Sequence, residues 1–208
     1  MIPVYLEVGN KRVFACAFDW PGWCRAARSE EQALEVLRAA APRYAVVARE
    51  AGVELPAAEF EVVQRLPGSA TTDFGAPGAI PQHDSQPLPA RDQQRMLRLV
   101  QAAWSVFDRV AAAAPAELRK GPRGGGRDRD TIVAHVLDAE GAYAGRLGLR
   151  LKVPSLSETA AITEFRAALV EALQHPPPGA KWPPRYAARR IAWHALDHAW
   201  EIEDRTDG

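Results

Sequence analysis

The sequence has few cysteines, no net charge and no long hydrophobic run, and each of these absences excludes a class of protein. Its two cysteines, Cys16 and Cys24, are too few for the disulfide framework of a small secreted domain, and they fit free thiols in a reducing cytoplasm. No run approaches the ~18 consecutive apolar residues that a membrane span requires. Residues 1–12 lack the basic start and apolar middle of a signal peptide. We therefore expect a cytoplasmic protein that does not bind a membrane.

Charge of one sign is also lacking, because 26 Lys and Arg residues balance 26 Asp and Glu residues. Non-specific nucleic-acid binding relies on a broad basic field, which a chain of zero net charge does not have. Nucleic acid is therefore not an expected partner, although zero net charge does not exclude a local basic patch. Hydrophobic residues make up 47% of the 208 positions, which is enough to bury a core in one large domain or two small ones.

The sequence that is present divides into two parts with different periodicities. In the first part, residues 3–8 alternate apolar and polar positions with a period of two, Gly9 and Asn10 supply turn chemistry, and residues 11–18 form a second apolar run. This pattern predicts a β-hairpin. Residues 19–22 then end the strand, because proline lacks the amide donor and glycine permits the turn.

A helix and a third strand complete the first part. Ser29 and Gln32 form a capping box, which predicts that a helix begins there. Pro42 lies inside the helical pattern and predicts either a kink or the start of a second helix. Residues 60–66 have the pattern of a strand. Residues 1–68 are therefore expected to form a small α/β domain.

Proline and glycine are concentrated in residues 69–89, which we interpret as a linker or as a long active-site loop. From residue 90 onward the apolar spacing is helical, and breaks rich in proline and glycine separate four amphipathic stretches. Four such helices predict a bundle over residues 90–208, and the fold class is α+β. The predicted helices are 91–114, 128–147 or 130–147, 155–173 with a capping box at Ser155 and Glu158, and 184–204.

Three of the five histidines lie within these helices. His194 and His198 are four positions apart, so both rings project from one face about one turn apart. His135 lies near the start of an earlier helix, and inward residues of facing helices meet in the core of a bundle, where bundles build metal sites. The second ring N–H of a ligating histidine needs an acceptor, for which Asp197 and Asp138 are the candidates.

Three neutral imidazole nitrogens suit a divalent metal. Zinc or nickel is expected, with ferrous iron or copper as alternatives, and three ligands leave a coordination position for water or substrate. The alternative is that the histidines are solvated or packed without metal, as HxxxH pairs on helices usually are. The other two histidines, His83 and His175, lie in loops rich in proline and are expected in solvent.

The segments TIVAHVLDAEGAY and RRIAWHALDHAWEIED resemble the DinB/YfiT-like superfamily. The resemblance covers roughly residues 90–205 and implies a metal-binding four-helix bundle with one histidine on its second helix and two on its fourth. By position these are His135, His194 and His198. The superfamily includes transferases and isomerases that use a small thiol, namely bacillithiol, mycothiol or glutathione. Its members often dimerise, so a homodimer is one expectation.

The segment FACAFDWPGWCRAARSEEQALEVL resembles the HicB-like antitoxin fold, a small domain related to a partial RNase H. This resemblance implies that Cys24 to Ala27 form a short strand, where the residue pattern alone indicates a loop. No set of catalytic carboxylates accompanies it. The first domain is therefore expected to bind or to oligomerise, and not to act as a nuclease.

Together these features favour a metal-dependent enzyme in which a low-molecular-weight thiol is activated for transfer to, or isomerisation of, a small electrophilic molecule. Arg190, one turn before His194, is the candidate for binding an anionic group, and the neighbouring Arg189 is an alternative. Glu201, about one turn after His198, is the candidate proton acceptor. These charged residues equally fit a solvated helix face with surface ion pairs.

Two other functions stay open. The first is a non-enzymatic, antitoxin-like regulator with a structural metal, which a closed coordination shell would favour. The second is a metal-dependent hydrolase that uses bound hydroxide. The glycine-rich residues 121–127 lack the Lys-Ser/Thr of a phosphate-binding loop, so we interpret them as a flexible connection between helices. No residue is assigned to an organic cofactor.

Overall fold

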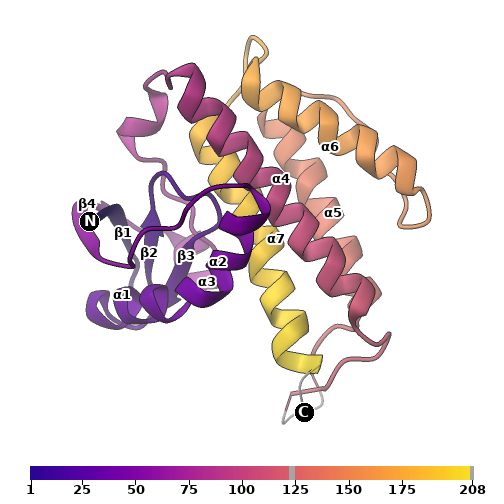
Figure 1. Cartoon of the computed structure of the whole chain (residues 1–208), viewed down its shortest axis with the longest axis horizontal. Coiled ribbons are helices and arrows are strands. Elements are labelled where there is room, and N and C mark those ends of the chain that lie inside the picture. The colour runs from indigo at the N-terminus through magenta and orange to yellow at the C-terminus, as the bar shows by residue number, and fades with distance from the viewer. Residues whose placement is uncertain (122–124, 207–208) are drawn as a thin grey trace. The chain divides into compact units, whose positions relative to one another are not determined.

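The computed structural model describes residues 1–121 and 125–206. Among these residues it contains one four-stranded sheet and seven α-helices, so the fold class is mixed α+β, as the sequence predicted (Figure 1). The chain divides into two compact units, Met1–Ala102 and Ala103–Gly208. Their boundary falls within helix α4 (Ala90–Ala113).

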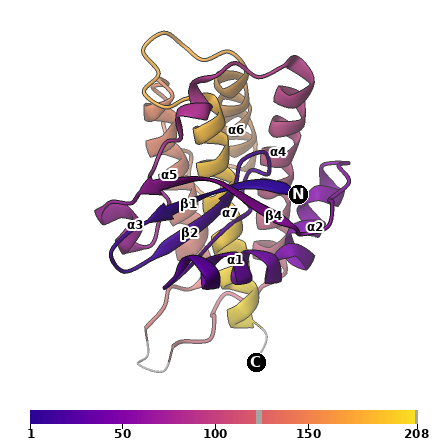
Figure 2. The same ribbon diagram turned by 90° about the vertical axis from the view of Figure 1, so that its left-hand side faces the viewer.

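The sheet of the first unit has the strand order β3-β2-β1-β4 (Figure 1). Figure 2 shows its strands β1, β2 and β4 from another side. Strands β1 and β2 form the predicted antiparallel hairpin, whereas β4 pairs with β1 in parallel and lies at the edge of the sheet. Strand β3 occupies the four residues for which the HicB-like resemblance implied a strand and the residue pattern implied a loop. The strands are β1 (Ile2–Val8), β2 (Val13–Ala17), β3 (Cys24–Ala27) and β4 (Phe60–Pro67).

The pairing of β2 with β3 places Cys16 directly opposite Cys24, with their Cα atoms 4.2 Å apart. The two sulfur atoms are joined as a disulfide, so the expectation of free thiols is wrong for this structure. The cause of the difference is the register of β3 with β2, which the residue pattern did not predict because it indicated a loop at Cys24. Both cysteines are buried.

Two helices connect β3 with β4. The hydroxyl of Ser29 accepts a hydrogen bond from the amide of Gln32 and caps helix α1 (Glu30–Ala39), as predicted. Helix α2 (Ala41–Glu50) begins at the proline that interrupts the helical pattern, because proline is tolerated in a first turn. The alternative of a second helix, and not that of a kink, is therefore confirmed.

A buried aromatic pair fastens these helices to the turn after β2. The rings of Trp23 and Tyr44 stack with centroids 5.0 Å apart, and both side chains are fully buried. The indole of Trp23 donates to the carbonyl of Leu37 at 2.9 Å, and the hydroxyl of Tyr44 donates to the carbonyl of Pro21 at 2.8 Å. Both polar groups are thereby satisfied inside the core, which is the condition for burying them. Burial raises the pKa of Tyr44.

The segment that was interpreted as a linker or loop contains helix α3 (Ala70–Phe74) and a short 3₁₀ helix (Gln82–Ser85), and it is anchored to the first unit. The carboxylate of Glu7 on β1 is fully buried and accepts hydrogen bonds from the hydroxyl of Thr72 and from the amides of Gly78 and Ala79. The amide of Lys11, in the turn between β1 and β2, donates to Asp73 at 2.7 Å. These bonds fix residues 69–79 against the hairpin.

The second unit consists of the end of α4 with α5 (Arg129–Arg146), α6 (Thr159–Gln174) and α7 (Pro184–Thr206), where α5 and α6 each pack on α7. All four helices were predicted. Helix α6 begins later than expected, because Ser155 does not cap it; its amide and hydroxyl bond the carboxylate of Glu158 in the turn before the helix. Asp128 is the N-cap residue of α5, but its carboxylate accepts from Leu118 and Lys120.

A buried ion pair connects three of these helices. Glu140 on α5 is 1% exposed and accepts from the indole of Trp104 on α4 at 2.8 Å and from Arg166 on α6 at 3.1 Å. Arg166 also donates to the carboxylate of Asp108 on α4 at 2.8 Å. Burial raises the pKa of Glu140, and the charge of Arg166 opposes this shift. The network therefore holds α4, α5 and α6 together through one largely desolvated carboxylate.

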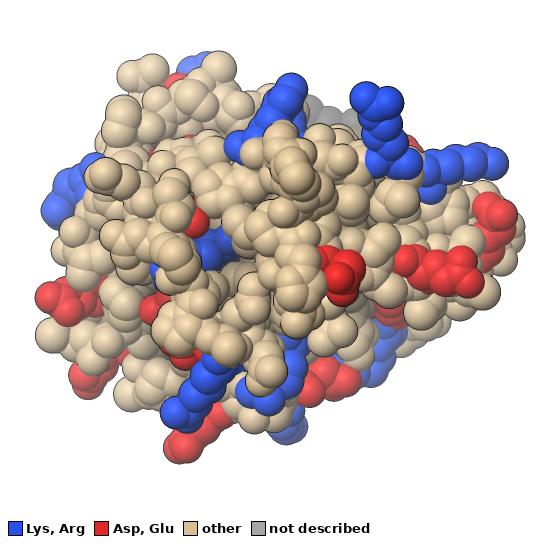
Figure 3. Space-filling model, turned by 90° about the horizontal axis from the view of Figure 1, so that it is seen from above, with Lys and Arg blue, Asp and Glu red and all other residues tan. Residues whose placement is uncertain are grey.

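Among the described residues, no helix is long and apolar enough to cross a membrane. On the face shown in Figure 3, basic and acidic side chains are interspersed.

Candidate metal centre

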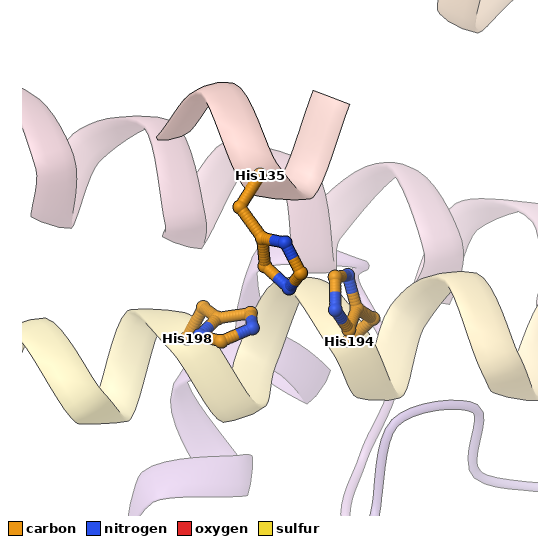
Figure 4. A group of neighbouring side chains, drawn as sticks. All are labelled: His135, His194 and His198. Atoms are coloured by element: carbon orange, nitrogen blue, oxygen red, sulfur yellow. The ribbon is translucent and has the colours of Figure 1, made fainter. Parts of the chain in front are cut away.

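The three histidines singled out in the sequence lie together in the second unit (Figure 4). His194 and His198 project from successive turns of α7 with ring centroids 4.6 Å apart, and His135 reaches them from α5. The ring centroid of His135 is 5.0 Å from that of each of the other two. One ring nitrogen from each residue lies within 4.8 Å of the others. The structure thus brings together the residues that the spacing predicted, whereas His83 and His175 are exposed elsewhere.

Burial keeps two of the three rings uncharged. His194 is 8% exposed and His198 is 7% exposed, whereas His135 is half-buried. Burial, and after it the neighbouring histidines His198 and His135, lower the pKa of His194 to about 2. Burial followed by the charge of Arg127 also lowers the pKa of His135. At neutral pH the imidazoles of His194 and His135 are therefore neutral, which is the form that offers a lone pair to a metal.

A carboxylate orients one of the three rings. The Nδ1 atom of His198 lies 2.7 Å from Glu201, one turn further along α7. The hydrogen bond from His198 is the main reason why the pKa of Glu201 lies below its usual range, so this carboxylate stays ionised and accepts the ring N–H. With Nδ1 donating, Nε2 of His198 is left as the acceptor. Arg205 donates to the other oxygen of Glu201 at 3.1 Å.

The orienting carboxylate is not one of the two that the sequence suggested. For His198 it is Glu201, whereas Asp197 precedes His198 directly in sequence and Asp138 is exposed. Asp138 acts on His135 through its charge, which raises the pKa of that ring. A residue three positions further along a helix lies on the same face, and a directly adjacent one does not. The helix geometry therefore favours Glu201 as the partner.

Arg190 and the aromatic side chains of Tyr143, Trp182 and Trp193 lie beside the cluster on the side of His194. The guanidinium carbon of Arg190 lies 4.8 Å from the ring centroid of Trp193 and 5.5 Å from that of Tyr143. The ring of Tyr143 lies 5.9 Å from His194 and 5.2 Å from the ring of Trp182. Burial raises the pKa of Tyr143. Arg190 and Glu201, the two candidate residues beside the predicted ligands, thus lie at opposite ends of the histidine cluster along α7.

Two neighbours of the cluster were not assigned to it from the sequence. Tyr143 lies on the same predicted helix as His135, on its apolar stripe. Such a position also fits ordinary core packing. Arg127 belongs to the glycine-rich connection before α5, and its guanidinium lies 3.8 Å from Glu201. Nothing in the local spacing of residues 121–127 predicts this contact, since it depends on the packing of α5 against α7. Residues 122–124 of that connection lie outside the described part of the chain.

The histidine cluster fits a divalent metal in its chemistry. The Nδ1 atom of His194 is buried and has no hydrogen-bond partner among the described residues, and a buried nitrogen without a partner is costly unless it binds something. Zinc holds histidine nitrogens at about 2.0–2.1 Å, which places them about 3.3 Å from one another in a tetrahedron. Small rotations of the rings from their present separation of up to 4.8 Å would reach that geometry. Three protein ligands would leave a position for a further molecule.

Comparisons with protein-family models, with curated proteins and with solved structures found no match to this chain.

Proposed function

We propose that this protein is a metal-dependent enzyme that uses a small thiol in a transfer or isomerisation reaction on a small electrophilic molecule. The observation that carries the proposal is the convergence of three imidazoles from α5 and α7, one of them oriented by Glu201. A histidine that only packs in a core does not need two further histidines beside it. A metal-binding histidine needs other ligands beside it, and its second ring nitrogen needs a hydrogen-bond acceptor such as a carboxylate.

The resemblance to DinB/YfiT-like proteins supports this proposal. One histidine on the second helix of a four-helix bundle and two on its fourth is the arrangement that the resemblance implies. In this chain α5 and α7 are the second and fourth of the helices after residue 89, and they contribute His135 and the pair His194 and His198. The first unit, with a helical segment between β3 and β4, agrees with a HicB-like domain in its order of elements.

A divalent metal at this site would supply a Lewis acid that lowers the pKa of a thiol or polarises a carbonyl. The chain's own residues would do the rest. Three neutral imidazoles would contribute no charge to the site, so the metal would retain its full positive charge toward the thiol. Glu201 would hold the Nδ1 proton of His198, so that this ring keeps one tautomer.

In the proposed transferase reaction the thiol gives its proton to water, and its sulfur forms a bond to the electrophilic carbon. The bond to the leaving group breaks, and that group departs with the electron pair. In an isomerisation the same C–S bond forms, the substrate rotates about the bond that has become single, and the C–S bond then breaks. Arg190 would orient an anionic group, and Glu201 stays a candidate proton acceptor, although its hydrogen bonds to His198 and Arg205 favour an orienting role.

The test begins with metal. Untagged protein should contain about one zinc or nickel ion per chain, and His194→Ala should lose it, whereas the exposed His175→Ala should retain it. Metal-loaded wild-type protein should then consume bacillithiol, mycothiol or glutathione in the presence of an electrophile such as chlorodinitrobenzene. Thiol consumption no faster than that of His194→Ala would contradict the proposed enzyme. Retention of metal by His194→Ala would contradict the site itself.

A second function is favoured by a different observation. Among the residues that the structure describes, the histidine cluster is the only group of metal-binding side chains, so the first unit offers no such group for chemistry of its own. That unit fits a binding or oligomerisation role, in which case the protein would be an antitoxin-like regulator with a structural metal. Metal binding without any thiol or hydrolytic turnover would favour this alternative over the enzyme.

A further inference from the structure

Arg190 is placed unusually for a side chain that always carries a charge. It is half-buried on α7, and its Nε and Nη1 atoms are buried with no hydrogen-bond partner among the described residues. A guanidinium has five N–H donors in one plane, and leaving two of its nitrogens desolvated without acceptors is unfavourable. Trp193 and Tyr143 are its aromatic neighbours, and a hydrogen bond with the Tyr143 side chain engages Arg190 without reaching these two nitrogens.

The position of this guanidinium relates it to the histidine cluster. Arg190 precedes His194 by one helical turn, so both side chains emerge on the same face of α7. Tyr143 lies between them, 5.5 Å from the guanidinium carbon and 5.9 Å from the ring of His194. The cation is therefore close enough to act on a molecule bound at the cluster.

A divalent ion at the cluster would add positive charge beside Arg190. The carboxylate of Glu201 is already engaged by His198 and Arg205. An anion that lies against Arg190 would offset this charge and supply an acceptor to an unpartnered nitrogen.

We propose that the molecule bound at the metal carries a carboxylate, which Arg190 binds while another atom of the same molecule occupies the open coordination position. This inference rests on the proposed thiol chemistry and names the class of thiol, one with a carboxylate a few bonds from sulfur. A hydrogen bond from a guanidinium to a carboxylate is stronger than one to a neutral oxygen, so Arg190 selects the anionic thiol over a neutral one of equal length.

The probe is a matched pair of thiols, 3-mercaptopropionate and 3-mercaptopropanol, added to full-length protein loaded with Co²⁺. The sulfur-to-cobalt charge-transfer absorption reports thiolate binding at the metal. We expect wild-type protein to bind the carboxylate thiol about tenfold more tightly than the alcohol thiol, since a hydrogen bond to a charged group contributes that much. In Arg190→Gln this preference should fall to about twofold or less, and Arg190→Lys should restore part of it.

Controls separate this inference from the proposed function. Arg150→Gln, which removes an exposed arginine, should keep the wild-type preference. The affinity of each variant for Co²⁺ and its thermal unfolding show whether Arg190→Gln leaves the fold and the metal site intact. If Arg190→Gln fails to fold, Arg190→Lys serves alone, and its preference for the carboxylate thiol should lie below that of the wild type.

Four results would overturn the inference. Equal affinities for the two thiols in wild-type protein, or a preference that survives in Arg190→Gln, would contradict the role of Arg190 and leave the metal and thiol chemistry in place. Propionate that strengthens binding of 3-mercaptopropanol would show that the carboxylate belongs to a second molecule. Absence of a charge-transfer band with either thiol would contradict the proposed thiol chemistry and this inference together.

Discussion

At the scale of single residues, the histidine cluster is defined by a few hydrogen bonds that the sequence only partly reveals. The i, i+4 spacing of His194 and His198 was enough to predict that both rings share one face of a helix. The partner of His198 was not chosen from the sequence, because several acidic residues lie within two turns of the predicted ligands. The choice of Glu201 depends on the rotamers that the packed helix allows.

The substitution Glu201→Gln tests the role of this carboxylate. The amide can no longer hold the Nδ1 proton of His198 as a charged acceptor, so we expect the affinity for Zn²⁺ to fall about 10–100-fold. Competition with a chromophoric chelator measures the affinity. The exposed Glu164→Gln on α6 is the matched control and should bind Zn²⁺ like the wild type. An unchanged affinity in Glu201→Gln would show that the hydrogen bond has no part in metal binding.

A second prediction at this scale concerns Asp73. Hydrogen bonds to its carboxylate, first of all from the amide of Lys11, lower its pKa in the folded protein. A carboxylate with a lowered folded pKa adds stability above its unfolded pKa, and this contribution disappears as the pH falls through the folded pKa. Asp73→Asn should therefore destabilise the protein at neutral pH, and the difference should disappear as the pH falls through the folded pKa of Asp73. Urea unfolding from neutral to acidic pH measures the difference. A constant difference at all pH values would contradict the role of the charge.

At the scale of elements, most helices and strands were predicted because their signals are local. The Ser29 cap, the proline in the first turn of α2 and the glycine turn after β1 each act within a few residues. The residue pattern missed or misplaced elements where pairing decides. Strand β3, which only the HicB-like resemblance implied, is four residues long and depends on its register with β2. Helix α3 follows a composition that is typical of loops, yet the buried Glu7 holds it in place.

The ion pair between Glu140 and Arg166 gives a prediction at this scale. Arg166→Met would leave a buried carboxylate on α5 without its cation, which should destabilise the protein by about 3–5 kcal/mol. The comparison variant Asp108→Asn removes only the exposed carboxylate of the same network. It should lower the free energy of unfolding by at most about 1 kcal/mol. Equilibrium unfolding in denaturant compares the two. Similar losses in both variants would mean that the pair with Glu140 adds little.

At the scale of the whole molecule, the sequence was sufficient for the α+β class and for a change in character along the chain, because strand and helix periodicities differ. It was not sufficient for the place of the boundary between the two compact units, which falls at Ala102 within a continuous helix. Composition changes at residue 69, but contacts decide which unit a segment belongs to. The hydrogen bonds of Glu7 assign residues 69–79 to the first unit, and no local pattern contains that information.

A prediction at this scale concerns the effect of metal binding on each of the two units. A ligand that binds only the folded state stabilises it by about 2.7 kcal/mol at 100 times its dissociation constant. Hydrogen exchange with and without Zn²⁺ should therefore show slower exchange in α5 and α7, which carry the three ligands, and unchanged exchange in strands β1–β4. His198→Ala should show no response to Zn²⁺ in any segment. Slower exchange in the sheet would show that the metal site is coupled to the first unit.

The buried carboxylate of Glu7 has a consequence for anyone who divides this gene. A fragment that stops where the composition changes, at residue 68, would discard all three donors to Glu7 and strand a negative charge inside the sheet. Such a fragment would precipitate or unfold for reasons unrelated to its own hydrophobic core. An expression boundary for the amino-terminal half must therefore lie beyond Ala79, even though the composition of residues 69–79 resembles that of a linker.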